Sequence, residues 1–154
     1  LLLKGIHEER FAPLYKAHLT PKARLREGRA LALGKLASSA IDVSDGLAKD
    51  VGHICDESGV GVAIRLADIP LSPELKEAAS LLGEDPFCWA LAGGEDYQLL
   101  FTVPPEKASQ VRQALYPTPV SEIGLILAPQ EGRYLLLPDG SKRPLEPEGW
   151  DHFA

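Results

Sequence analysis

The feature that most constrains this chain is an acidic turn between an apolar strand and an amphipathic helix, residues 38–47. Ser44 is expected to cap the helix, with Asp45 in its first turn beside the positive end of the helix dipole. Asp42 is expected to lie on the incoming strand. Three apolar residues recur at i, i+4 and i+7, the spacing of one helix face: Leu47, Val51 and Ile54.

The two carboxylates in this turn favour a cation. Asp42 and Asp45 would repel by about 1 kcal/mol at ~4 Å in water, and by about 4 kcal/mol at an effective dielectric of ~20. Magnesium is the natural candidate, because it takes one or two protein carboxylates, keeps several waters and accepts phosphate oxygens. The same residue types also serve in ordinary caps and turns, so both interpretations stay open here.

A second acidic stretch follows in residues 90–97. Gly93 and Gly94, where backbone can approach a ligand closely, stand directly before Glu95 and Asp96. The glycine pair could also be a simple turn into the next strand, which is expected at residues 98–103. Two acidic sites at strand edges in one small domain favour a functional site.

Four motifs, taken together, resemble the C-terminal half of the thiamine-monophosphate kinase family. That family belongs to the superfamily of aminoimidazole ribonucleotide synthetase and selenophosphate synthetase. The motifs span nearly the whole chain and appear in the family's order: PKARLREG at 21–28, IDVSDGL at 41–47, GGEDY at 93–97 and GWDHF at 149–153. Arg24 matches the basic position of the family's Pro-x-x-Arg signature.

The resemblance implies phosphoryl transfer from ATP to thiamine monophosphate, giving thiamine diphosphate with the help of Mg²⁺. By this resemblance Asp42 and Asp45 would hold the metal, with Asp45 as the catalytic residue, and Ser44 would contact phosphate. The substrate side would consist of Glu95, Asp96 and Trp150. Trp150 could stack on the flat or cationic rings of the substrate, or could be a hydrophobic latch; both readings stay open.

The resemblance also implies an α+β fold with a mixed sheet and packed helices. We expect residues 1–4 to be the end of a missing N-terminal domain, 5–20 a linker helix and 21–154 the C-terminal domain. The intact protein would pair as a homodimer, and this part alone would be inactive. The patterns predict further elements: helices at 22–36, 73–82 and 106–115, a short turn carrying Phe87 and Trp89, strands at 59–64, 120–127 and 133–137, and a turn at 138–141.

The composition of the chain argues against several classes of protein. With 154 residues and 45% hydrophobic content, the chain is expected to build one core without disulfides. Its 22 acidic against 16 basic residues, a formal charge of −6, argue against a nucleic-acid surface. No apolar run reaches the ~18 residues of a membrane span. Cys55 and Cys88 have no metal-site spacing, so we expect reduced thiols in a cytoplasmic protein.

Three other functions remain open. The chain could belong to a selenophosphate synthetase or a hydrogenase-maturation relative of the same superfamily. It could be a non-catalytic module that keeps only a substrate half-site. It could also be an assembly domain whose acids merely cap helices.

Overall fold

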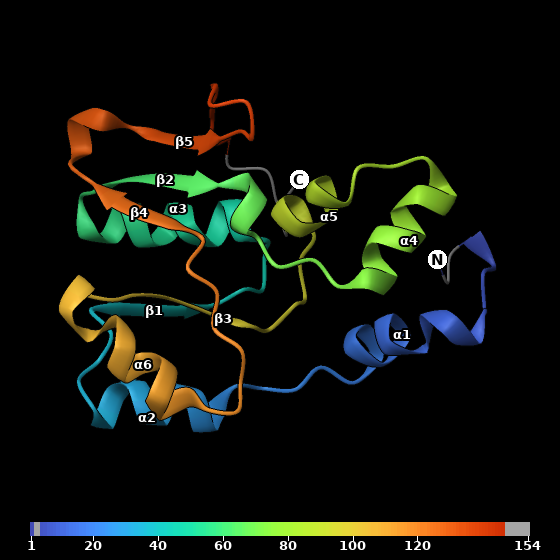
Figure 1. Cartoon of the computed structure of the whole chain (residues 1–154), viewed down its shortest axis with the longest axis horizontal. Helices are drawn as coiled ribbons and strands as arrows, with labels where there is room; N and C mark the ends of the chain where they lie inside the picture. Colours follow the sequence, from blue (N-terminus) through green and yellow to red (C-terminus); the bar gives the residue numbers. More distant parts are fainter. Residues whose placement is uncertain (2–3, 147–154) are drawn as a thin grey trace.

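The computed structural model describes residue 1 and residues 4–146, and places six α-helices and six strands among them (Figure 1). The helices are α1 (Ala12–Leu19), α2 (Leu25–Leu33), α3 (Leu47–Ser58), α4 (Pro73–Leu82), α5 (Pro86–Ala92) and α6 (Ala108–Leu115). The strands are β1 (Ser39–Asp42), β2 (Gly61–Arg65), β3 (Leu99–Thr102), β4 (Gly124–Leu127), β5 (Arg133–Leu136) and β6 (Lys142–Pro144). Single 3₁₀ turns are η2 (Glu9–Phe11), η3 (Leu66–Asp68), η4 (Pro105–Lys107) and η5 (Pro129–Glu131).

The strands form two sheets. β1 and β3 pair antiparallel in a two-stranded sheet, and the larger sheet has the order β4-β2-β5-β6. Within the larger sheet β2 is antiparallel to β4 and parallel to β5, so the fold is α+β with a mixed sheet, as predicted. β4 and β5, which follow one another in sequence, do not pair with each other but flank β2.

Two hydrophobic cores share the small sheet. Leu100 of β3 packs against the first core, which α3, β2 and β5 build. Leu99 and Phe101 pack against the second core, which contains Leu31 of α2 and Leu115 of α6. This alternation follows from the period of two along a strand. Figure 1 shows the result: α2 and α6 lie on one side of β1 and β3, and the larger sheet lies on the other.

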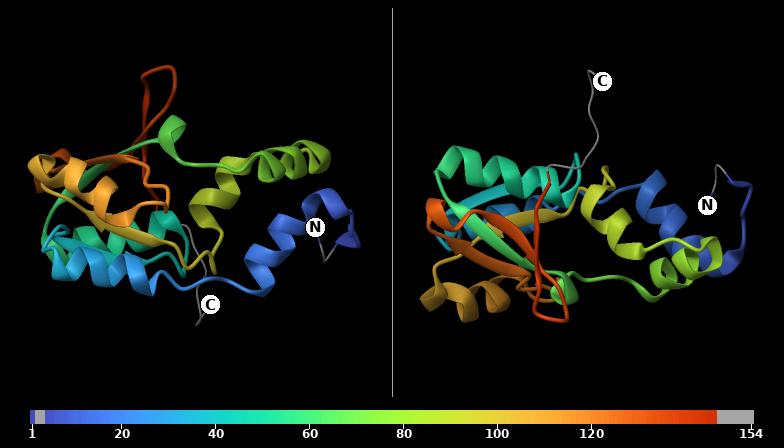
Figure 2. Two further views of the ribbon diagram at one scale, coloured as in Figure 1. Left: turned by 60° about the horizontal axis from the view of Figure 1, so that its bottom comes forward. Right: turned by 90° about the horizontal axis from the view of Figure 1, so that it is seen from above.

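Residues 4–19 form an N-terminal arm that packs on α4, away from the sheets (Figure 2). Phe11 is fully buried at the start of α1, and Arg10 forms an ion pair with Glu77 of α4. Lys4 reaches Glu84 at 3.0 Å. Pro13 lies in the first turn of α1, where a backbone N–H has no helical partner, so it does not break the helix. Residues 2 and 3, within the segment expected to end a missing N-terminal domain, lie outside the described residues.

Most predicted elements are present, with local differences. The helix expected at 22–36 covers only Leu25–Leu33, and the one expected at 106–115 begins with a 3₁₀ turn. The predicted turn around Phe87 and Trp89 is the helix α5, because Asp85 caps it by accepting from the Phe87 amide at 2.9 Å. The turn at 138–141 joins β5 to β6, a strand that was not anticipated.

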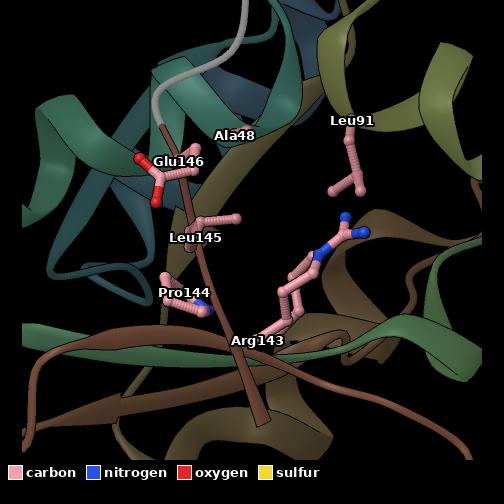
Figure 3. Close-up of a pocket in the computed structure, with 7 residues that line it drawn as sticks. Ala48, Leu91, Arg143, Pro144, Leu145 and Glu146 are labelled. Atoms are coloured by element: carbon pink, nitrogen blue, oxygen red, sulfur yellow. The ribbon is translucent and has the colours of Figure 1, made fainter.

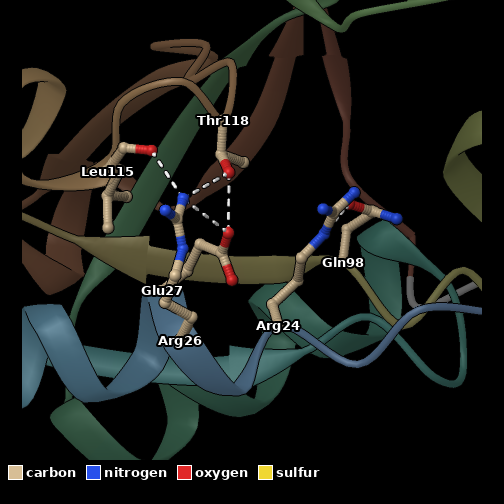
Figure 4. Close-up of polar contacts among 6 residues, drawn as sticks. All are labelled: Arg24, Arg26, Glu27, Gln98, Leu115 and Thr118. Carbon is tan, nitrogen blue, oxygen red and sulfur yellow. Dashed lines mark hydrogen bonds and ion pairs between the residues drawn. The ribbon is translucent and has the colours of Figure 1, made fainter.

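A buried carboxylate ties α2 to the chain that follows α6 (Figure 4). Thr118 donates its hydroxyl to Glu27 Oε1 at 2.6 Å, and Arg26 Nη2 lies 3.3 Å from the same oxygen. These contacts, the Thr118 hydroxyl foremost, lower the pKa of Glu27 from 4.5 to about 2. Glu27 therefore contributes stability that requires its charge.

Replacing Glu27 by glutamine is expected to destabilise the fold above pH 4.5 and to have progressively less effect as the pH falls toward 2. The unfolded chain binds a proton at higher pH than the folded chain, so the contribution of Glu27 is lost between these two pKa values. Urea unfolding at pH 7, 4 and 2.5, with the exposed Glu57→Gln variant as control, measures the difference. A Glu27→Gln penalty that did not change with pH would contradict this assignment.

Candidate functional site

The first acidic stretch is a loop between β1 and α3, and its helix begins later than expected. α3 begins at Leu47 with Gly46 at its N-cap position, so Ser44 is not the cap and Asp45 is not in the first turn. Both residues precede the helix and are partly buried. Gly46 has a φ of +115°, a conformation that only glycine adopts readily, and this glycine determines where the helix starts. Asp42 is the last residue of β1, as predicted.

No side chain of residues 4–146 caps α3; the Asp50 side chain instead binds the backbone of the loop before the helix. Its Oδ2 accepts the backbone N–H of Ser44 at 3.0 Å and of Asp45 at 3.1 Å. The residue is only 2% exposed. Burial raises the pKa of the Asp50 carboxyl, and the two backbone amides oppose that rise.

The second acidic stretch lies directly beside the first. The Glu95 amide donates to the Ser44 carbonyl at 2.8 Å, and the Tyr97 amide donates to the Val43 carbonyl at 2.8 Å. A Cβ on Gly94 would lie 2.6 Å from the Ser44 carbonyl oxygen, closer than side-chain atoms can approach. Glycine is therefore needed at this contact. The structure brings together the two stretches that the sequence singled out separately.

We expect Gly94→Ala to destabilise the protein by about 1–3 kcal/mol, the usual cost of forcing an atom into a packed contact. Gly52, in the middle of α3, has open space around the position of a Cβ. Gly52→Ala is therefore expected to stabilise by about 0.5–1 kcal/mol. Urea unfolding of both variants tests the pair, and a neutral Gly94→Ala would show that the two loops are not in contact.

The predicted site carboxylates have different surroundings. Asp45 Oδ2 lies 3.2 Å from Lys49 Nζ, and Glu95 Oε2 lies 3.9 Å from His18 Nδ1 of α1. Asp96 is exposed by surface area, yet neighbouring atoms desolvate its carboxylate enough to raise its pKa. Trp150 lies outside the described residues.

Asp42 and Asp45 are close in sequence but face different neighbours. Asp42 is exposed and pairs across the sheet with Leu99, which packs against the core beneath α2. Residues directly opposite in an antiparallel pair project from the same face, so Asp42 lies on the α2 side of the sheet. Asp45 instead contacts α3. Shared coordination of one ion by Asp42 and Asp45 stays a prediction.

The donor chemistry of the first loop fits a hard cation at Asp45. Among the described residues, one group could hold a metal through atoms within 4.8 Å of one another: Asp45, Asp50 and His53. Asp50 already accepts two backbone amides, and histidine is not a preferred magnesium ligand. Asp45 is partly exposed and offers a hard carboxylate oxygen, and a metal ion bound there would replace the Lys49 ammonium, which lies 3.2 Å from Oδ2. Magnesium commonly takes few protein ligands, so one carboxylate here suffices for a partial site.

A small hollow lies between α3, α5 and β6 (Figure 3). Its volume is about 190 Å³, and Figure 3 shows the Arg143 guanidinium pointing across it toward Leu91. The hollow's other lining residues are Ala48, Leu135, Pro144, Leu145 and Glu146. Small-molecule pockets usually measure about 300–1,000 Å³. This hollow is therefore too small to enclose a nucleotide-sized ligand by itself.

Sequence reasoning missed Asp50 and His53. Asp50 falls on the apolar face of α3, between Leu47 and Val51, where a charged residue needs a special reason. A charged residue on this apolar face was the sequence signal that could have identified Asp50.

Arg24 is also held in place, because its Nε donates to Gln98 Oε1 at 2.9 Å beside the second loop (Figure 4).

The sequence profile of a protein family, AIR synthase related protein, C-terminal domain, matches residues 4–135. The chain belongs to this family. Two curated relatives of this AIR synthase related domain are thiamine-monophosphate kinases. The enzyme of Escherichia coli K12 is 43% identical over 92% of this chain, and that of Aquifex aeolicus is 38% identical over 99%. The chain spans only 42% and 45% of their lengths.

Solved structures agree with this placement of the AIR synthase related domain. AaThiL complexed with AMPPCP and TMP has a TM-score of 0.80 and 38% identity, covering 99% of this chain and 45% of its own. HypE of E. coli, a hydrogenase maturation protein, has a TM-score of 0.65 and 25% identity, covering 81% of this chain and 40% of its own. In the described part of the chain, no helix has the length and apolar character needed to cross a bilayer.

Proposed function

We propose that this chain is the C-terminal part of a magnesium-dependent kinase that transfers a phosphoryl group from ATP to thiamine monophosphate. One observation carries the proposal: the two acidic loops are joined by the hydrogen bond from the Glu95 amide to the Ser44 carbonyl, at 2.8 Å. This contact supports a single site built from the two stretches that the sequence singled out separately. The similarity to thiamine-monophosphate kinases over nearly the whole chain supports the choice of substrate.

The proposed roles follow the position of each side chain. Asp45, with Asp42 from β1, would hold magnesium, and Ser44 would contact a phosphate oxygen. A bound magnesium ion would supply neutralisation of negative charge on the phosphates. Glu95, Asp96 and Trp150 would form the substrate side. In-line phosphoryl transfer needs little covalent help from protein, so catalysis would come mainly from positioning and charge, with Asp45 as the catalytic residue.

The rest of the ATP site would come from a further domain. The small volume of the hollow lined by Ala48 and Leu91, and the chain's coverage of less than half of its relatives' length, support this division. We propose that this part alone does not turn over, and that the intact protein acts as a homodimer in the cytoplasm.

A chimera tests the proposal. The part of the E. coli kinase that this chain does not match is fused to this chain, and thiamine diphosphate formation from thiamine monophosphate and Mg–ATP is measured by chromatography. The parent kinase and the kinase fragment without this chain are the controls. We expect product only with both parts present.

The other outcomes identify the alternatives. Consumption of ATP without thiamine diphosphate would favour another reaction of the superfamily. Calorimetric binding of thiamine monophosphate to the chain, without turnover in the chimera, would favour a binding module. Neither binding nor turnover would favour an assembly domain and would contradict the proposal.

A further inference from the structure

Asp50 is a buried carboxylate that forms no ion pair with the described residues. It is 2% exposed, and among the described residues no lysine, arginine or histidine nitrogen lies within ion-pair distance of it. An isolated buried charge is costly unless hydrogen bonds compensate it. The compensation here comes from backbone amides, since Oδ2 accepts from Ser44 at 3.0 Å and from Asp45 at 3.1 Å.

These hydrogen bonds hold the loop rather than the helix alone. The Asp50 amide donates to the Gly46 carbonyl at 2.9 Å, which closes the first turn of α3, while its side chain folds back over the residues before the helix. The backbone of Ser44 and Asp45 is therefore fixed from the core side. The Asp45 carboxylate projects from a backbone whose position depends on Asp50.

The second loop depends on the same contacts. The Ser44 carbonyl accepts the Glu95 amide at 2.8 Å, so a displacement of Ser44 would also displace Glu95. Gly46 is confined as well, because a Cβ on it would lie 3.1 Å from the Ala92 carbonyl that leads into the second loop. The Asp50 carboxylate thus stands at the start of a chain of contacts that reaches both acidic loops.

We propose that Asp50 is a positioning residue of this site: by binding the Ser44 and Asp45 amides it places Asp45 and, through the Ser44 carbonyl, Glu95. Its catalytic consequence rests on the proposed function. The carboxylate also occupies the two backbone amides just before the helix, those of Ser44 and Asp45, which would otherwise be available to an anion. A phosphate group in this site is therefore contacted by side chains and a metal ion, and not by the amides of Ser44 and Asp45.

Amide hydrogen exchange of the 154-residue chain, followed by NMR, tests the positioning itself. In Asp50→Asn we expect exchange at Ser44, Asp45 and Glu95 to become at least about tenfold faster, with β2 and β5 unchanged. Asp56→Asn is the matched control, because Asp56 lies on the same helix but is exposed and paired with Arg133 at 2.5 Å. Unchanged exchange at the three amides, or acceleration spread evenly over α3, would overturn the proposal.

Kinetics of the chimera test the consequence. We expect Asp50→Asn to lower kcat by about 10–100-fold, the usual effect of removing a group that orients a metal ligand, with the KM for thiamine monophosphate changed by less than about threefold. A kcat equal to that of Asp56→Asn would overturn the catalytic consequence. If Asp50→Asn does not fold, Asp50→Glu, which keeps the charge but displaces it, is measured in the same two ways against the same outcomes. An inactive wild-type chimera would defeat the proposed function, whereas amide exchange would still decide the role of Asp50.

Discussion

Asp45→Asn is expected to lower the kcat of the chimera on the order of a hundredfold while leaving the fold intact. A bound metal contributes several kcal/mol of charge stabilisation in phosphoryl transfer, and a neutral amide cannot balance its charge. The Asp45 side chain is 24% exposed, so an isosteric replacement removes little packing. Steady-state kinetics at increasing Mg²⁺ concentrations, with a melting curve for each variant, measure the effect.

The ion pair with Lys49 provides the control for this experiment. Lys49→Gln removes the 3.2 Å partner of Asp45 but keeps the carboxylate, so turnover should survive. Asp42→Asn shows whether the two acids share an ion: if they do, it lowers kcat as Asp45→Asn does. Near-normal turnover of Asp45→Asn at saturating Mg²⁺ would contradict its role as a metal ligand.

Phe11→Ala is expected to cost about 3–5 kcal/mol of folding free energy, the range for deleting a large buried aromatic side chain. Phe11 is fully buried where the N-terminal arm meets α4, and Arg10 lies over its ring at 4.7 Å. For a domain of this size the loss corresponds to a fall in Tm of about 10 °C. Thermal and urea unfolding give the value.

Leu19→Ala is the matched control, because Leu19 belongs to the same arm but is 64% exposed. Its effect should stay within about 0.5 kcal/mol. A loss below about 1 kcal/mol for Phe11→Ala would show that the arm is not packed on α4 in solution.

Local signals in the sequence account for much of the fold. Ser72 caps α4 by accepting the Leu75 amide at 3.1 Å, and α4 has the predicted bounds. The spacing of Leu47, Val51 and Ile54 correctly predicted the buried face of α3. The order β4-β2-β5 was not predictable in the same way, because strand pairing between distant segments leaves no local pattern.

The candidate site was harder to predict than the fold. The sequence indicated both acidic loops but not their contact, which depends on backbone atoms of Ser44 and Glu95. Ser44 resembled a cap by residue type, but α3 begins after Gly46, and the Ser44 amide donates to the Asp50 carboxylate instead. Asp42 and Asp45 appeared to be natural metal partners by spacing alone, whereas their different neighbours appear only with the strand register.

The join between the acidic loops has an evolutionary consequence. It is made by main-chain atoms, the Glu95 amide on the Ser44 carbonyl and the Tyr97 amide on the Val43 carbonyl. Side chains at positions 44, 45, 95 and 96 can therefore be exchanged without removing these hydrogen bonds, provided that the glycine at 94 remains and that residue 95 tolerates the positive φ of 66° found for Glu95. Because main-chain hydrogen bonds hold the two loops together, the reacting side chains can change during evolution while the distance between the loops stays the same. This is one physical way in which a single fold can come to support several chemistries.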